Sequence, residues 1–261
     1  MLEHSLLQQA ECLGRSRRKS VPVVAKLATS ALDFQNAWRL RYEAYASAGY
    51  LHHSDKRIYL DKYDNETNRT LLLYRGGTPI ASARVCILLE PSARTPECAI
   101  PAYEIFQEEI DQHLALLQED GRPERSIEVT RLSRSPQFGS DLAVTQALFR
   151  MIGYLIIHFN ASVMFAAVSA NHIPFYRRMG FKLIGNPRSY PDLAVQTALM
   201  GCDCHGHRPI NGLLSSLGSL SKQDLIYRRF MEGQEVEVTP EQRRQSVSLT
   251  AVETIPTPKA V

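Results

Sequence analysis

The segment SIEVTRLSRSP, residues 126–136, combines a strand-like pattern with an acidic and a basic residue three positions apart. A carboxylate such as Glu128 can act as a general base, and a guanidinium such as Arg131 can bind an anion through two parallel hydrogen bonds. Side chains alternate along a strand, so these two would face opposite sides unless an extra residue is inserted between them. We therefore expect a β-bulge at Val129 or Thr130 that directs both groups into one cleft. The alternative is a surface ion pair at a strand end, which would contribute about 0–1 kcal/mol.

Further charged and aromatic residues precede this segment at spacings that suit a shared site. Arg41 and Tyr45 lie four positions apart, so on a helix they share one face. Asp61 and Asp64 follow in a stretch of loop composition, and one arginine can satisfy two such carboxylates. The pattern predicts a buried ionic lattice that orders the loop 46–69 as a lid. Metal binding by the two aspartates is the alternative, although no third ligand is evident.

A stretch rich in cysteine and histidine, CDCHGH at residues 202–207, places four potential zinc ligands within six residues. Structural zinc sites usually space each pair of ligands by two or more residues and draw the pairs from separated segments. The close spacing favours a strand end with solvent-facing His205 and His207 over a zinc site. We therefore predict no bound metal. The sequence contains no Gly-x-Ser-x-Gly, Walker or dinucleotide-binding motif.

The elements that must position these residues alternate between strand and helix. The expected strands cover residues 21–28, 70–74, 79–89, 126–134, 162–169, 181–185 and 193–201. The expected helices run from Ser30 to near Gly49 and over residues 105–117, 141–158 and 171–179. Gly76 and Gly77 join the second and third strands as a hairpin, and residues 91–101 form a connector. This order predicts an α/β protein.

The composition is that of a globular protein that can bury a sizeable core. The chain has 261 residues, of which 44% are hydrophobic and 22% charged. This fits one main domain at 21–204, preceded by a flexible basic tail at 1–20 and followed by a partly disordered extension at 205–261. No run of about 18 apolar residues occurs, so we expect no membrane span. We also expect no secretory signal. The amphipathic N-terminal tail could make a weak contact with a membrane.

The net charge limits the classes of binding partner, and the cysteines indicate the cellular compartment. A formal net charge of +3 is too small to indicate a nucleic-acid partner, and no basic stripe is interleaved with aromatic residues. The five cysteines are odd in number and unevenly spaced, which argues for a reducing compartment over a disulfide framework. We therefore expect a cytoplasmic protein.

The chain resembles two related enzyme families, the acyl-homoserine-lactone synthases and the long-chain N-acyl amino acid synthases. The resemblance rests on RYEAY, GY, DKYD, SAR and EVTR, which carry eight residues in the family order: Arg41, Tyr45, Tyr50, Asp61, Asp64, Arg84, Glu128 and Arg131. In addition, NHIPFYRRMGFKL at 171–183 resembles the Asn-x4-Tyr-x3-Gly-Phe signature of the GCN5-related N-acetyltransferase fold, in which the tyrosine lies beside the departing thiol. Lactone synthases generally lack that ending, so the N-acyl amino acid synthases are the closer resemblance.

This resemblance implies a fold and a pair of substrates. The fold is the GCN5-related N-acetyltransferase-like one, with a mixed, mostly antiparallel central sheet that is flanked by helices and splayed at the strand containing Glu128. The substrates would be an acyl thioester and an amino acid, with no permanently bound cofactor. The fold usually carries a glycine-rich loop whose amides bind the pyrophosphate of coenzyme A. Here SPQFGSDLA has one glycine and the acidic Asp141, which favours the phosphopantetheine thioester of acyl carrier protein over coenzyme A.

The resemblance also suggests roles. Glu128, acting directly or through water, would deprotonate the acceptor ammonium, for which burial must raise its pKa against the pull of Arg131. A backbone N–H beside the bulge would stabilise the carbonyl oxygen, and Tyr176 would protonate the leaving thiolate. Arg84 or Arg131 would hold the carboxylate of the acceptor. Alternatively, Tyr176 fills the core and Glu128 is a structural partner of Arg131.

We therefore predict an N-acyltransferase that moves a medium or long acyl chain from acyl carrier protein, or from acyl-coenzyme A, to the α-amine of an amino acid. The apolar helix 141–158 would line the acyl slot. Two alternatives stay open: a homoserine-lactone synthase, and a non-catalytic acyl-binding or scaffold protein. Beside the catalytic Glu128 and Tyr176, the expected substrate-binding residues are Arg84, Arg131, Arg41, Tyr45, Tyr50, Asp61 and Asp64.

Overall fold

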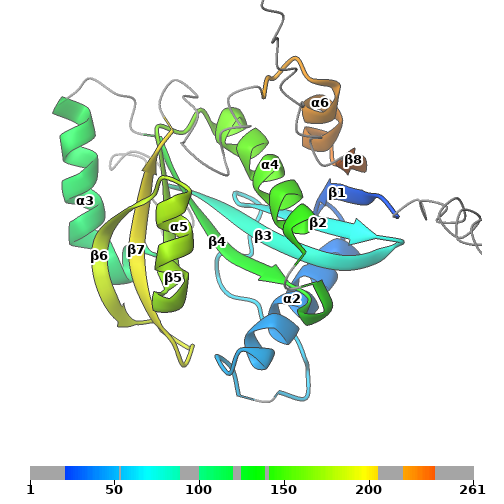
Figure 1. Ribbon diagram of the computed structural model, residues 1–261, viewed down its shortest axis with the longest axis horizontal. Helices are drawn as coiled ribbons and strands as arrows, with labels where there is room; N and C mark the ends of the chain where they lie inside the picture. The colour runs from blue at the N-terminus through cyan, green and yellow to red at the C-terminus, as the bar shows by residue number, and fades with distance from the viewer. Residues whose placement is uncertain are drawn as a thin grey trace, which may run out of the picture.

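An eight-stranded mixed sheet forms the centre of the molecule, with helices on both of its faces (Figure 1). The computed structural model describes residues 21–52, 54–88, 100–119, 125–138, 141–204 and 220–238. The predictions for the tail 1–20, for most of the connector 91–101, for His205 and His207 and for the end of the chain lie outside the described residues.

The strands follow the predicted order, and one more is added near the C-terminus. They are β1 (Val23–Leu27), β2 (Arg69–Arg75), β3 (Thr78–Leu88), β4 (Ser126–Arg134), β5 (Val163–Ser169), β6 (Lys182–Ser189), β7 (Gln196–Asp203) and β8 (Val236–Val238). Their order in the sheet is β6-β7-β5-β4-β3-β2-β1-β8. All neighbouring pairs are antiparallel except β4 and β5, which are parallel. The predicted mixed, mostly antiparallel sheet is confirmed.

Four of the helices lie where the sequence pattern places them, and the last one, near the C-terminus, is additional. They are α2 (Ala31–Ser47), α3 (Tyr103–Glu119), α4 (Leu142–Phe159), α5 (Ile173–Arg178) and α6 (Leu225–Met231), with short 3-10 turns η3 (Pro136–Phe138) and η4 (Ala170–His172). Ser30 and Asp33 form a capping box at the start of α2, in which each side chain accepts a hydrogen bond from the backbone N–H of the other. This local chemistry explains why the start of α2 could be read from the sequence.

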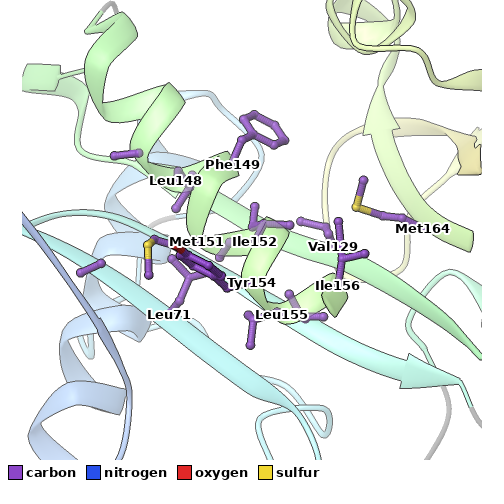
Figure 2. Close-up of a cluster of buried hydrophobic side chains, with 14 of the residues drawn as sticks. Leu71, Val129, Leu148, Phe149, Met151, Ile152, Tyr154, Leu155, Ile156 and Met164 are labelled. Atoms are coloured by element: carbon purple, nitrogen blue, oxygen red, sulfur yellow. The ribbon is translucent and has the colours of Figure 1, made fainter. Parts of the chain in front are cut away.

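The helix α4 is the centre of the larger hydrophobic core. Twelve of its residues are buried, and Figure 2 shows its side chains packed close to Leu71 of β2 and Val129 of β4. By length and composition this helix could cross a membrane, but 67% of it is buried inside the protein. A helix that is apolar all round and covered on all sides is a core element. It supports β2, β3 and β4 from one face, while α2 and α3 cover the other.

The segment 220–238 of the C-terminal extension packs onto the main sheet. β8 pairs with β1 in an antiparallel ladder, with Val23 opposite Val238. The hydroxyl of Tyr154 in α4 donates to Asp224, which precedes α6, at 2.9 Å. The sequence pattern did not indicate β8, because a three-residue strand is too short to show alternation.

The sheet splays open between β4 and β5. These strands pair only over Ser126–Glu128 and Val163–Phe165, and beyond these residues they diverge (Figure 1). Glu128 therefore occupies the apex of the splay. The two facing edges beyond the apex are not paired with each other, so they leave a gap in the middle of the sheet. The predicted splay at this strand is confirmed.

The predicted bulge is present, but not at Val129 or Thr130. On the edge of β4 that faces β3, two residues, Arg131 and Leu132, lie opposite the single residue Ala83. Arg131 adopts a left-handed backbone conformation with φ of 52°, which costs roughly 1–3 kcal/mol for a residue with a side chain. In this conformation the guanidinium of Arg131 reaches the carboxylate of Asp61.

Candidate active site

Three arginines and two aspartates form a buried ionic lattice between α2, the loop before β2, β3 and β4. Arg41 Nη1 and Nη2 donate to the two carboxylate oxygens of Asp64 at 2.7 and 3.1 Å. Arg84 makes the same paired contact with Asp61 at 2.6 and 3.0 Å, and its Nη1 also lies 2.9 Å from Asp64. Arg131 Nε and Nη2 both donate to Asp61 Oδ2, at 2.9 and 2.7 Å. The lattice thus links four separate segments of the chain.

Charge-assisted hydrogen bonds hold the lattice together, although Nε of Arg41 and Nε of Arg84 have no partner among the described residues. Burial alone would raise the pKa of Asp61, but the hydrogen bonds and charges of Arg84 and Arg131 outweigh it and hold that pKa well below its usual range. The pKa of Asp64 is lowered against burial in the same way, chiefly by Arg41. The predicted lattice is present, but its ion pairs differ from the prediction. Arg84, and not Arg41, bridges the two aspartates.

The two arginines expected to hold the acceptor carboxylate are therefore engaged within the protein. The side chain of Arg84 is 0% exposed, and both its Nη atoms face Asp61 or Asp64. Arg131 is also buried, and its guanidinium stacks over the rings of Tyr59 and Tyr190 at 4.9 and 5.2 Å from their centroids. Neither arginine is therefore free to bind a ligand carboxylate through two parallel hydrogen bonds.

Glu128 lies beneath the apex of the splay with no exposed surface. Its Oε2 accepts a hydrogen bond from the backbone N–H of Ala102 at 2.8 Å, while no described residue bonds to its Oε1. Burial raises the pKa of this carboxyl to about 7, although the Ala102 N–H, Arg131 and Arg84 all act in the opposite direction. The expected raised pKa is confirmed, with the expected cause.

A cavity of about 630 Å³ occupies the gap between β4 and β5. Its walls come from helices on both faces of the sheet, so the cavity passes through the sheet at the splay. Glu128 itself does not line it, but the next residues of β4 do. The lining residues are Ala44, Tyr45, Ala48, Tyr50, Val129 to Arg134, Leu142, Thr145, Leu148, Phe149, Ala167 to Ser169, His172, Phe175, Tyr176, Tyr190, Leu193, Val195 and Thr197.

Tyrosines gather at the α2 end of this cavity. The predicted Tyr45 and Tyr50 both line it, with ring centroids 6.2 Å apart. Tyr190 lines it too, and its position next to Arg131 and Glu128 shows in its pKa, which burial and the charge of Glu128 raise while Arg131 opposes them. The sequence did not single out Tyr190, because it lies in a turn of ordinary loop composition. The backbone N–H of Ala194 donates to the carbonyl of Tyr50 at 2.9 Å and holds that turn in place.

Tyr176 lines the cavity from the α5 side. Its ring packs edge-on against Phe175 and Phe181, with centroids 5.8 and 5.1 Å away, and it is 8% exposed. Burial raises the pKa of its hydroxyl, so the group keeps its proton at neutral pH. Among the described residues none hydrogen bonds to that hydroxyl. Tyr176 therefore fills part of the core with its ring and presents an uncommitted donor to the cavity.

The other end of the cavity lies near the start of α4. Arg134, which the sequence did not single out, donates from Nη1 to the hydroxyl of Thr145 at 2.7 Å, and both residues line the cavity. Asp141 caps α4 by accepting from the backbone N–H groups of Ala143 and Val144 at 2.9 and 3.3 Å. The first amides of this helix are therefore occupied by the carboxylate of the chain itself.

The cysteines of the CDCHGH stretch lie away from this cavity. Cys202 and Cys204 are both buried in or just after β7, and the thiol of Cys202 faces the carbonyl of Gly180 at 3.8 Å. In the part of the chain that the structure describes, no three His, Cys, Asp or Glu side chains come together as metal ligands. Asp61 and Asp64 bind arginines instead.

Comparisons with known proteins place this site in context. A family model described as N-acyl amino acid synthase FeeM matches residues 36–203, which include every predicted site residue. Comparison with curated protein sequences finds no match. Among solved structures, FeeM, an N-acyl amino acid synthase from uncultured soil microbes, is 16% identical with a TM-score of 0.57, and the alignment covers 72% of this chain and 94% of FeeM.

Two other solved structures share the fold. The acyl-homoserine-lactone synthase LasI is 12% identical with a TM-score of 0.53, over 77% of this chain and 98% of LasI. TofI is 16% identical with a TM-score of 0.51, over 76% and 97% of the two chains. Because the family model covers more than half of the chain, the protein belongs to the FeeM family of N-acyl amino acid synthases and is an acyltransferase that transfers an acyl group to an amine.

Proposed function

We propose that this protein transfers a medium or long acyl chain from the phosphopantetheine thioester of an acyl carrier protein to the α-amine of an amino acid. One observation carries the proposal: a cavity passes through the splayed sheet and ends beside a buried carboxyl whose pKa is about 7. Such an opening lets a donor and an acceptor approach from opposite faces and meet next to a base. The use of a carrier protein would place the reaction in the cytoplasm.

The shape of the splay suits an extended donor arm. Beyond Glu128 and Phe165 the facing edges of β4 and β5 are not paired, so their backbone groups are available to the amides of a pantetheine arm laid between them. Much of the remaining wall is apolar, including Leu132, Leu148 and Phe149, which suits an acyl chain. These features support a pantetheine thioester as donor.

The start of α4 favours a carrier protein over coenzyme A. A helix N-terminus attracts phosphate groups because its first N–H groups have no partner within the helix. Here Asp141 takes up the amides of Ala143 and Val144, and Arg75 neutralises its charge at 2.9 Å. The pyrophosphate of coenzyme A would have to displace a carboxylate that is already satisfied.

The residues around the apex support a direct aminolysis. The amine nitrogen of the acceptor attacks the thioester carbon, and its proton passes to Glu128 through a water or a cavity hydroxyl, since Glu128 does not line the cavity itself. A backbone N–H of the bulged part of β4 stabilises the carbonyl oxygen. The carbon–sulfur bond then breaks, and Tyr176 supplies the proton that the thiolate takes. The proton taken up by Glu128 then returns to Tyr176 through the same water or hydroxyl path, so that the products are an amide and a free thiol and the protein is regenerated.

The acceptor would bind at the tyrosine end of the cavity. Tyr45, Tyr50 and Tyr190 offer hydroxyls there, and Arg131 adds a positive charge even though Asp61 shares it. A carboxylate-bearing amine is the acceptor that this combination suits. Arg41, Arg84, Asp61 and Asp64 then act indirectly, by holding Arg131 and the loop before β2 in position.

A product assay tests this proposal. The purified protein is given an acyl carrier protein loaded with a long acyl chain, together with a pool of amino acids and, separately, S-adenosylmethionine. We expect N-acyl amino acids to be detected by mass spectrometry. An acyl-homoserine lactone formed only with S-adenosylmethionine would contradict the proposal and support the lactone synthase alternative. Equal rates with acyl-coenzyme A would contradict the choice of donor.

A further inference from the structure

A positively charged group without a carboxylate partner lines the wide end of the splay. Arg134 is the last residue of β4, where β4 and β5 have already diverged, and it is half-buried in the cavity wall. Its Nη1 is fixed by the hydroxyl of Thr145 at 2.7 Å. No aspartate or glutamate of the described ranges forms an ion pair with it. Each arginine of the lattice, by contrast, forms an ion pair with an aspartate.

A second nitrogen-bearing group lies at the same end. His172 lines the cavity, and its Nδ1 is 3.0 Å from the hydroxyl of Ser169, which leaves Nε2 for another partner. Burial lowers the pKa of this histidine, and the charge of Arg134 lowers it further, which shows that the two side chains sense each other. Arg134, Thr145 and His172 all line the cavity, and Arg134 keeps N–H groups free for a ligand, whereas the hydroxyl of Thr145 donates to the carbonyl of Asp141 at 3.3 Å.

The distance from this corner to the apex matches a phosphopantetheine arm. Arg134 lies six residues beyond Glu128 on β4, but the bulge takes up one of them, because their partners on β3, Cys86 and Ala81, are five residues apart, or roughly 17 Å at about 3.3 Å per residue. An extended phosphopantetheine arm spans roughly 16–18 Å from sulfur to phosphorus, given bond lengths of about 1.3–1.5 Å. A thioester held near Glu128 therefore brings the phosphate to Arg134. The alternative anion site, the amides of α4, is occupied by Asp141.

We propose that Arg134, with Thr145 and His172, binds the single phosphate of the pantetheine arm of the donor, in place of the helix amides. This inference rests on the proposed function, because it assumes that a pantetheine thioester is the donor. A guanidinium bonded to a phosphate is a strong, charge-assisted contact. The same phosphate ester occurs in coenzyme A, so the experiment compares both sources.

Binding of the unacylated arm tests the inference without turnover. Calorimetric titration of the full-length protein compares 4′-phosphopantetheine, pantetheine and coenzyme A. We expect phosphopantetheine to bind about tenfold or more tightly than pantetheine, as one charge-assisted contact requires. Coenzyme A should bind no more tightly than phosphopantetheine. Equal affinities for phosphopantetheine and pantetheine would overturn the inference, and a further tenfold gain with coenzyme A would show that the helix amides take its pyrophosphate.

Two variants locate the effect. Arg134→Gln should abolish the preference for phosphopantetheine, whereas Arg178→Gln, an exposed arginine of α5 outside the cavity, should keep it. A preference that survives in Arg134→Gln would overturn the assignment. If the phosphate preference is present but the product assay gives no amide with any donor, the proposed function fails and the phosphate site stands. If amides form from acyl-pantetheine as fast as from acyl-phosphopantetheine, only the phosphate site fails.

Discussion

Two arginines of β4 differ in whether a carboxylate pairs with them. Arg131, at the bulge, is buried among aromatic rings and bonded twice to Asp61. Arg134, three residues further on, lies half-buried in the wall of the cavity and contacts only the neutral hydroxyl of Thr145 among the described residues. A charge that is fully paired inside a protein serves its structure, since removing one partner leaves the other buried and uncompensated. A charge held in a cavity without a counterion is available to a ligand.

The largest expected effect is a loss of stability when an ion pair of the lattice is removed. Asp64→Asn removes the carboxylate that pairs with Arg41 and contacts Arg84, both of which are 0% exposed. We expect the free energy of unfolding to fall by about 3–5 kcal/mol, because the buried Arg41 loses its carboxylate partner and Arg84 loses one of two. Urea denaturation measures the change, and Asp192→Asn on the exposed turn beside Tyr190 is the control. A loss as small as that of the control would show that the lattice is not a structural unit.

Glu128, which precedes both arginines on β4, should reveal a catalytic role through the pH dependence of the turnover rate. A base with a pKa of about 7 is ionised above that pH, so the rate should rise as the pH increases through about 7. Glu128→Gln should lower the turnover rate by about 10²–10⁴-fold and remove this rise. Glu108→Gln, on the exposed side of α3, is the control. An unchanged rate would assign Glu128 to structure alone.

The same carboxyl gives a stability test with a defined sign. Its pKa in the folded protein, about 7, lies above the ordinary value of about 4.3. The folded state therefore binds an extra proton between these values, and the free energy of unfolding should fall as the pH rises from about 4.3 to about 7. Glu128→Gln should not show this particular decrease, so above pH 7 it should be at least as stable as the original protein. A decrease of the same size in the variant would contradict the raised pKa.

The mildest test concerns the cavity side. Tyr176→Phe removes a hydroxyl that bonds to no described residue and leaves the ring packed between Phe175 and Phe181. We expect the stability to change by no more than about 0.5 kcal/mol. The turnover rate should nevertheless fall by about tenfold or more, because the leaving thiolate loses its proton donor. Full activity in this variant would reduce Tyr176 to a packing residue, and a large loss of stability would contradict the contrast between the lattice and the cavity.

The order of the elements could be read from the sequence because it depends on local signals. Ser30 and Asp33 mark the start of α2, and Gly76 and Gly77, both with positive φ, mark the hairpin turn. The pattern predicts a lattice of Arg41, Asp61 and Asp64, because one arginine can satisfy two carboxylates, whereas Arg84 or Arg131 is expected to hold the carboxylate of the acceptor. What each arginine pairs with was not readable in this way.

Only the tertiary structure decided the pairing and the cavity. The bulge lies at Arg131 and Leu132, and the Arg131 guanidinium bonds there to Asp61, seventy residues away. Tyr190 and Arg134 reach the cavity through the divergence of β4 and β5, which is a property of the sheet and of no single segment. Local sequence determines where a strand or helix begins and ends. Contacts between distant segments determine which charged side chains form ion pairs and which line the cavity without a counterion.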